Sequence, residues 1–146
     1  MLMIWHLTPM LVATRIRLYP DLEQREALAR QFGCARFVWN RALSLKQRAY
    51  AQRAESLSIY ALKAMLPQWK EELPWLAEAD SQALQQSILN LGRAYDNFFA
   101  HRAGFPKAKV KHGEQGIQYP QRVKLDGALV YLPQVGWVKA RARSRP

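Results

Sequence analysis

The sequence predicts an α+β fold in which a helical segment is inserted between an early strand and several later strands. Three features support this prediction. Apolar and basic side chains alternate over residues 11–20, apolar residues recur with helical periodicity over residues 21–103, and short β-prone pieces separated by turns follow from Gly104 onward. A chain of 146 residues, 49% of them hydrophobic, can bury one ordinary core or two small ones. We therefore expect one unit built in one or two parts.

Residues 1–10 precede the patterned sequence and are interpreted as a leader outside the fold. Met3 and Met10 follow Met1 closely, so two explanations stay open, a mis-assigned start or a disordered extension. The run is apolar, but it lacks a basic leader and is too short to span a bilayer. We expect no targeting signal and no membrane partner.

Residues 11–20 are expected to form the first strand. Apolar residues alternate there with Arg15 and Arg17, so an extended chain has one apolar and one cationic face. Pro20 ends this strand, because proline cannot donate a hydrogen bond to a neighbouring strand.

About four helices are expected over residues 21–103. Asp21 and Gln24 are typical of a capping box, and the first helix runs from there until Gly33 interrupts the apolar periodicity. The second helix runs from about Cys34 to Arg53. A break between two short helices is also typical of a helix-turn-helix, although many helical domains share it.

The third helix is capped by Ser58, and Pro67 is expected to kink it or end it early. The fourth helix begins at Ser81 and has the clearest pattern of the chain, because its apolar residues form a stripe that must be buried. The opposite face carries hydrogen-bonding groups, and it is interpreted either as a solvated surface or as a reader of bases. The stripe consists of Leu84, Ile88, Leu91, Tyr95 and Phe98, and the opposite face of Gln82, Gln86, Asn90, Arg93 and Asn97.

Residues 104–146 are expected to form a basic loop followed by returning strands. Asp126-Gly127 lies between two β-prone pieces and predicts a hairpin turn, and residues 136–140 predict a further strand. We expect the first strand to pair with these later ones, which leaves the helices inserted between them.

The charge of the chain is strongly positive and unevenly distributed. A net charge of +11 and a sequence pI near 10.2 favour a polyanionic partner, with nucleic acid ahead of an anionic membrane surface. Residues 1–100 carry 12 basic and 9 acidic side chains, whereas residues 101–146 carry 10 and 2. Basic residues are interleaved there with Phe105, Tyr119 and Tyr131, a mixture that holds phosphates and stacks bases. The alternative is a basic surface that serves solubility alone.

The residues expected to bind RNA or phosphate are Arg15, Arg17, Lys107, Lys109, Lys111, Arg122 and Lys124.

No catalytic constellation is expected. The histidines His6, His101 and His112 have no carboxylate pair near them in the sequence, and Cys34 is the only cysteine, which allows neither an internal disulfide nor a cysteine-based zinc site. A helix start can lower the pKa of a thiol, but without a fixed partner base Cys34 is better interpreted as a small core residue. We expect no cofactor, no metal and no catalysis by this chain alone, in a reducing cytoplasm.

Six blocks of the sequence resemble the opening half of the TnpB/OrfB family, which insertion sequences of bacteria and archaea encode. The resemblance covers about residues 11–140, and six blocks in the same order are far more specific than any single one. The blocks are Arg17-Leu-Tyr-Pro20, Phe32-Gly-Cys-Ala-Arg-Phe-Val-Trp-Asn40, Asp80-Ser-Gln-Ala-Leu-Gln-Gln86, Tyr95-Asp-Asn-Phe-Phe99, Gly104-Phe-Pro106 and Leu132-Pro-Gln-Val-Gly-Trp-Val-Lys139.

The resemblance implies a fold, and it implies that recognition and catalysis belong to different domains. Members of the family, long described as transposases, are RNA-guided DNA endonucleases. Their amino-terminal half is a small, mainly antiparallel β-barrel, the wedge, with a helical recognition domain inserted in it. For this chain it implies a first wedge strand at 11–20, a recognition domain at 21–103 and returning strands at 104–146, with a barrel that is incomplete at its carboxyl end. The RuvC-like nuclease domain with its metal site, and a zinc ribbon, would follow after Pro146, so hydrolysis is not implied here.

The resemblance also implies a set of residues that read a short DNA motif flanking the target. A glutamine amide suits this task, because it pairs in a bidentate manner with an adenine edge. Family members often differ at the positions of Gln82 and Pro120, so a preferred flank sequence does not carry over. The implied DNA-binding residues are Ile59, Lys63, Ser81, Gln82, Gln85, Tyr119 and Pro120.

The partners expected from this resemblance are DNA and a guide RNA, in the bacterial or archaeal cytoplasm close to the nucleoid. Two alternatives stay open, a stand-alone DNA-binding regulator of transposition and a recognition subunit for a separately encoded nuclease half. A barrel that is cut short leaves a strand edge unpaired, so marginal stability or association is also expected.

Overall fold

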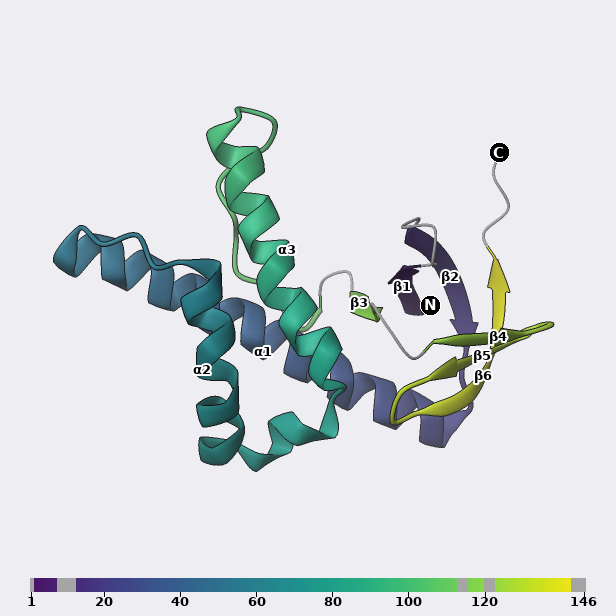
Figure 1. Ribbon diagram of the computed structural model, residues 1–146. Helices are drawn as coiled ribbons and strands as arrows, with labels where there is room; N and C mark the ends of the chain where they lie inside the picture. Colours follow the sequence, from purple (N-terminus) through teal and green to yellow (C-terminus); the bar gives the residue numbers. More distant parts are fainter. Residues whose placement is uncertain (1, 8–12, 113–115, 120–122, 143–146) are drawn as a thin grey trace.

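The computed structural model describes residues 2–7, 13–112, 116–119 and 123–142. Figure 1 shows the helices on one side and the sheet on the other, with one long helix extending along both. The helices are α1 (Leu22–Arg53), α2 (Ile59–Glu72), the short 3-10 helix η1 (Pro74–Glu78) and α3 (Ser81–Phe99). The strands are β1 (Leu2–Leu7), β2 (Ala13–Tyr19), β3 (Gly116–Tyr119), β4 (Lys124–Asp126), β5 (Leu129–Leu132) and β6 (Gly136–Ala142).

The six strands form one open sheet in the order β3-β1-β2-β6-β5-β4. β2 pairs antiparallel with β6, with Leu18 opposite Ala140, so the first predicted strand does return to the last ones. β4 and β5 form the predicted hairpin, in which Asp126 lies opposite Leu129 and Gly127 takes a positive φ of 59°. The sheet is not closed into a barrel over the described residues. The predicted α+β class, with helices inserted between strands of an incomplete wedge, is confirmed.

The amino-terminal residues depart from the expectation of a leader outside the fold. Residues 2–7 form β1, which pairs antiparallel with β2 and parallel with β3. Met3, for example, lies opposite both Arg17 and Gly116. Residues 2–7 form a nearly continuous apolar run without period-2 alternation, so the pattern that indicates a half-buried strand gives no signal for β1.

The first two predicted helices are one continuous helix of 32 residues, so the expected break at Gly33 is absent. The capping box at the start is confirmed, because Gln24 N donates to Asp21 Oδ1 (2.8 Å) and Asp21 N donates to Gln24 Oε1 (3.1 Å). The helix ends at Arg53, as predicted. A glycine within a helix costs only about 1 kcal/mol relative to alanine, and apolar residues on both sides of Gly33 are buried in the same helix, so packing outweighs this cost.

The rest of the helical part contains the two further helices predicted, α2 and α3, and in addition a short 3-10 helix between them. Ser58 caps α2 as expected, with its Oγ accepting a hydrogen bond from Ala61 N (3.1 Å). Pro67 does not end α2, which continues to Glu72. η1 then reverses the chain, and α3 begins at Ser81 as predicted.

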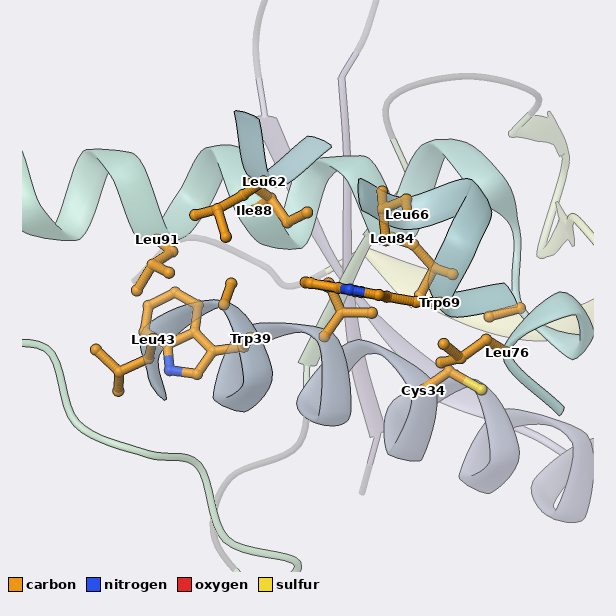
Figure 2. Packing of buried hydrophobic residues seen from close by; sticks show 13 residues of the cluster. Cys34, Trp39, Leu43, Leu62, Leu66, Trp69, Leu76, Leu84, Ile88 and Leu91 are labelled. Atoms are coloured by element: carbon orange, nitrogen blue, oxygen red, sulfur yellow. The ribbon is translucent and has the colours of Figure 1, made fainter. Parts of the chain in front are cut away.

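Two hydrophobic cores meet along α1. The first core fills the space between α1, α2, η1 and α3, where Leu62, Trp69, Leu84 and Ile88 are buried, and Figure 2 shows their side chains meeting between the helices. The second core lies between the first half of α1 and the sheet and contains Leu28, Phe32, Tyr119, Val130 and Val138. α1 contributes to both cores and therefore joins the helical part to the sheet.

Two glycine substitutions test the continuity of α1 at Gly33 and the close packing of α3 on α2 at Gly92. Gly33→Ala is expected to raise the free energy of unfolding by about 0.5–1 kcal/mol, because a Cβ at residue 33 would meet no atom closer than Arg36 Nη2 at 3.6 Å. Gly92→Ala in α3 is expected to lower it by about 1–3 kcal/mol, because a Cβ there would lie 2.7 Å from Cγ1 of Ile59. Urea denaturation measures both changes. A destabilising Gly33→Ala would show that the helix is broken at residue 33.

Candidate nucleic-acid interface

The basic segment at residues 104–111 lies against α1, and two residues of α1 form hydrogen bonds with its backbone. Trp39 Nε1 donates a hydrogen bond to the backbone oxygen of Lys107 (2.9 Å). Asn40 makes two bonds to the backbone of Lys109, because its Nδ2 donates to the carbonyl oxygen (2.9 Å) and its Oδ1 accepts from the N–H (2.7 Å). The backbone of this segment, here called the basic loop, is therefore held in one place, while the side chains of Lys107 and Lys111 are exposed.

Lys109 differs from the other lysines of the basic loop. Its ammonium lies 4.3 Å from the centroid of the Trp39 ring, a cation–π contact. Burial lowers the pKa of this ammonium. Lys109 is thus part of the attachment to α1, in addition to the phosphate-binding role expected for it.

Three of the four remaining residues expected to bind phosphate lie on the sheet. Arg17 is exposed on β2, and Lys124 is exposed on β4 with its ammonium 5.5 Å from the ring centroid of Tyr131. Arg15 occupies the β2 position opposite Trp5 of β1. Arg122 lies outside the described residues. The predicted set thus divides between the basic loop on α1 and the sheet.

The polar face of α3 is not plain solvated surface. Gln86 is buried, its Nε2 donates to Asn90 Oδ1 (2.9 Å), and Asn90 Nδ2 donates to Gln118 Oε1 of β3 (3.2 Å). These amides line one side of an open groove, together with Arg93 and the exposed Tyr60. The sequence did not indicate Gln118, because its partner on α3 lies 28 residues away.

Three of the predicted flank-reading residues lie at the start of α3. Ser81, Gln82 and Gln85 occupy its first turns and are half-buried. The Oγ of Ser81 accepts a hydrogen bond from Lys70 Nζ of α2 (2.6 Å). Lys70 is therefore a cation at this place that the sequence did not single out.

The other flank-reading residues lie elsewhere. Ile59 begins α2 and packs against Gly92 in the middle of α3, and Lys63 follows one turn later, half-buried. Since Lys70 contacts Ser81 while Ile59 contacts Gly92, α2 and α3 run in opposite directions, and Ile59 lies about 16 Å along α2 from Lys70. Pro120 lies outside the described residues.

The prediction that Tyr119 contacts nucleic acid is wrong, because its side chain is fully buried. The hydroxyl donates to Oε1 of Gln31 (2.6 Å), whose Nε2 donates to the carbonyl of Pro133 (3.0 Å). Burial, and to a lesser extent the negative charge of Asp80, raise the pKa of Tyr119 well above its ordinary value. The ring belongs to the core and offers no surface for stacking a base. Tyr119 was expected at the surface because it lies among basic residues and because the family resemblance implied a DNA contact, whereas β3 is packed against α1 and α3.

Cys34 is a core residue, as preferred from the sequence. It is buried in the middle of α1, and its Sγ lies 3.5 Å from the carbonyl of Trp75. Burial, and then the charge of Glu78, raise the pKa of the thiol to about 11, which leaves it protonated at neutral pH. His101 and His112 are exposed. Within the described ranges, no group of three or more histidine, cysteine or acidic side chains is placed to hold a metal ion.

No helix in the described part of the chain has both the length and the apolar character needed to cross a membrane.

Comparison with known proteins gives a family match and several related chains. A family described as a helix-turn-helix domain, of the OrfB type, matches residues 10–55. The chain is 37% identical over 135 residues to "Putative RNA-guided DNA endonuclease InsQ" of Escherichia coli (strain K12), which covers 90% of this chain and 34% of that protein. It is 41% identical over 101 residues to "Putative RNA-guided DNA endonuclease" of Streptomyces pristinaespiralis, covering 68% of this chain and 25% of the relative.

The chain belongs to the TnpB/OrfB family. It spans about a third and a quarter of the length of the two endonuclease relatives. It is also 40% identical to "Virulence protein VsdF" of Salmonella dublin, over 72% of this chain and 98% of that protein. The residues matched as a helix-turn-helix domain hold β2 and α1, and in this family member residues 22–53 form one helix.

Proposed function

We propose that the chain is a nucleic-acid-binding module of a transposon-encoded protein, and that its basic loop contacts phosphates. The observation that carries the proposal is the double attachment of this loop to α1 through Trp39 and Asn40. A loop held in place loses less conformational freedom on binding than a mobile one, so its exposed lysines are pre-organised for a polyanion. The net charge of +11 and the names of the two endonuclease relatives support DNA as the partner.

A more specific proposal is that the chain binds a guide RNA and reads a short DNA motif that flanks the target. In a longer protein with a nuclease domain, this chain would supply recognition and not hydrolysis. The start of α3 suits the reading of bases, because Gln82 and Gln85 offer amides next to the cation of Lys70. The division into a recognition domain at 21–103 and wedge strands at 11–20 and 104–146 belongs to this proposal.

A second candidate function is a stand-alone DNA-binding regulator. The observation in its favour is that the match between this chain and VsdF covers 98% of VsdF. A related protein therefore consists of little more than the matched residues. A regulator of this kind would bind duplex DNA without RNA, whereas a recognition module would bring a defined RNA with it.

RNA that copurifies with the chain tests the finer proposal. We would express the full chain with the transposon sequence that flanks its gene, wash it at moderate salt and sequence the retained RNA. Enrichment of one RNA from the transposon end is the expected result. Random RNA, or none, together with RNA-independent duplex binding would contradict guide binding and favour the regulator.

A further inference from the structure

Three arginines of α1 lie in line on one face of the helix. Arg30, Arg41 and Arg48 are separated by 11 and 7 residues, which are close to three and two full turns of about 3.6 residues. At about 1.5 Å of rise per residue, the three positions lie roughly 16 and 10 Å apart along the axis. All three line one open groove of about 820 Å³ along α1, which Trp75 and Glu78 of η1 also line. We call the three arginines the arginine rail.

The groove beside the arginine rail has an aromatic wall. Phe37 of α1 and Trp75 of η1 pack edge to face with ring centroids 5.0 Å apart, and Trp75 is 41% exposed. The guanidinium of Arg41 lies 5.1 Å from the ring centroid of Trp69 and 5.7 Å from that of Phe37. These contacts hold Arg41 in place and leave a tryptophan face beside a row of cations.

Among the described residues, the ion pairs of the arginine rail are partly or fully exposed to solvent. Arg30 Nε lies 3.6 Å from Oε2 of Glu78, with both side chains about half exposed. Arg41 Nη2 lies 3.2 Å from Oε2 of Glu72. Exposed pairs of this kind contribute little to stability, so the phosphates of a polyanion can replace these carboxylates as partners of the arginines. Arg48 is exposed and forms no ion pair with the described part of the chain.

The arginine rail adjoins the basic loop. Asn40 lines the same groove, and its side chain holds the backbone of Lys109. Lys109 lies 69 residues from Asn40 in the sequence, and its own side chain lines the grooves next to α3 and β3. Asn40 therefore connects the groove of the arginine rail to the backbone of the basic loop.

We propose that the arginine rail binds consecutive phosphates of a nucleic-acid strand, with Trp75 placed to stack against a base. This inference rests on the proposed function and extends its contact surface from the basic loop to the groove lined by α1 and η1. Guanidinium groups match phosphate geometry, and an aromatic face beside a cationic track is typical of strand binding. The rail is about 27 Å long, close to the rise of eight base-pair steps. DNA and RNA share this phosphate chemistry.

A pair of matched double variants tests the inference. R30Q/R48Q removes two charges from the rail and keeps Arg41, which packs on Trp69. R25Q/R53Q removes two charges from exposed positions on other faces of the same helix. Fluorescence anisotropy with a labelled random-sequence DNA duplex, and separately with an RNA hairpin, gives the affinity as a function of salt. Circular dichroism melts confirm that each variant is folded.

The rail variant is expected to weaken binding to all sequences. Its log–log salt slope should become shallower by about 1.8 for the duplex or about 1.4 for single-stranded segments, the value for two lost phosphate contacts. The control should change the slope by less than half as much. A change with only one probe assigns the rail to that nucleic acid. Equal slopes for rail and control variants would overturn the inference and leave the groove as a surface for protein contacts, while binding by the unaltered chain would still support the proposed function. No binding by the unaltered chain would overturn both.

Discussion

Gln31→Ala is expected to lower the free energy of unfolding by about 2–5 kcal/mol, since each buried polar group left without its partner costs roughly 1–3 kcal/mol. Gln31 is 1% exposed and joins three parts of the chain. Its Oε1 accepts the hydroxyl of Tyr119 in β3, and its Nε2 donates to Pro133 between β5 and β6. The substitution would leave both groups unsatisfied at the junction of α1 and the sheet. Urea denaturation measures the change.

Tyr119→Phe is the matched control, because it removes only the hydroxyl and keeps the ring in the core. Its expected cost is about 1–2 kcal/mol, the lower part of the range for one disrupted buried bond. A Gln31→Ala variant as stable as the unaltered protein would contradict the buried junction, and with it the correction that removes Tyr119 from the nucleic-acid surface.

Asn40→Ala is expected to weaken nucleic-acid binding by about five- to thirtyfold, the equivalent of one or two hydrogen bonds of about 1 kcal/mol each. The Asn40 side chain is not proposed to contact a phosphate. It holds the backbone of Lys109 by two bonds, so its loss releases the basic loop, which must then be ordered on binding. The measurement is equilibrium binding to a labelled DNA duplex.

The salt dependence separates this positioning role from a direct contact. Asn40→Ala should reduce affinity while leaving the log–log slope nearly unchanged, because the same lysines still meet the phosphates. K107Q/K111Q should make the slope shallower by about 1.8 for a duplex. Gln52→Ala, at an exposed position on α1, is the control and should change neither quantity. An Asn40→Ala variant that binds as well as the control would contradict the proposed role of the attachment.

Features of the fold that depend on short-range chemistry were predictable. The capping box at Asp21, the cap at Ser58 and the hairpin turn at Gly127 follow from residues close together in the sequence. The apolar stripe of α3 was also predictable, although only Leu84, Ile88 and Leu91 are fully buried and Tyr95 and Phe98 are half-buried. The continuity of α1 did not follow, because a glycine signals a break locally while burial on two cores favours a helix. β1 was missed because its residues form a nearly continuous apolar run, which lacks the period-2 alternation that indicates a strand.

The candidate site was predictable in composition but not in arrangement. The concentration of basic residues after Gly104 indicated the loop, and its lysines are at the surface. Trp39 and Asn40 were visible only as part of a family block, because their partners lie 68 and 69 residues away. Tyr119 looked like a stacking residue, and only the packing of α1 and α3 on β3 reveals that it is buried. Partners this distant in sequence leave no periodic signal.

The most direct test of the central claim is the affinity of the unaltered full chain for a labelled DNA duplex between about 50 and about 200 mM salt, the range in which phosphate contacts change affinity most visibly. The basic loop and the arginine rail together predict binding with a log–log slope of roughly −4 or steeper, at about 0.9 per phosphate contact. Binding that does not depend on salt, or no binding at the lowest salt, would contradict the claim that this chain is a nucleic-acid-binding module.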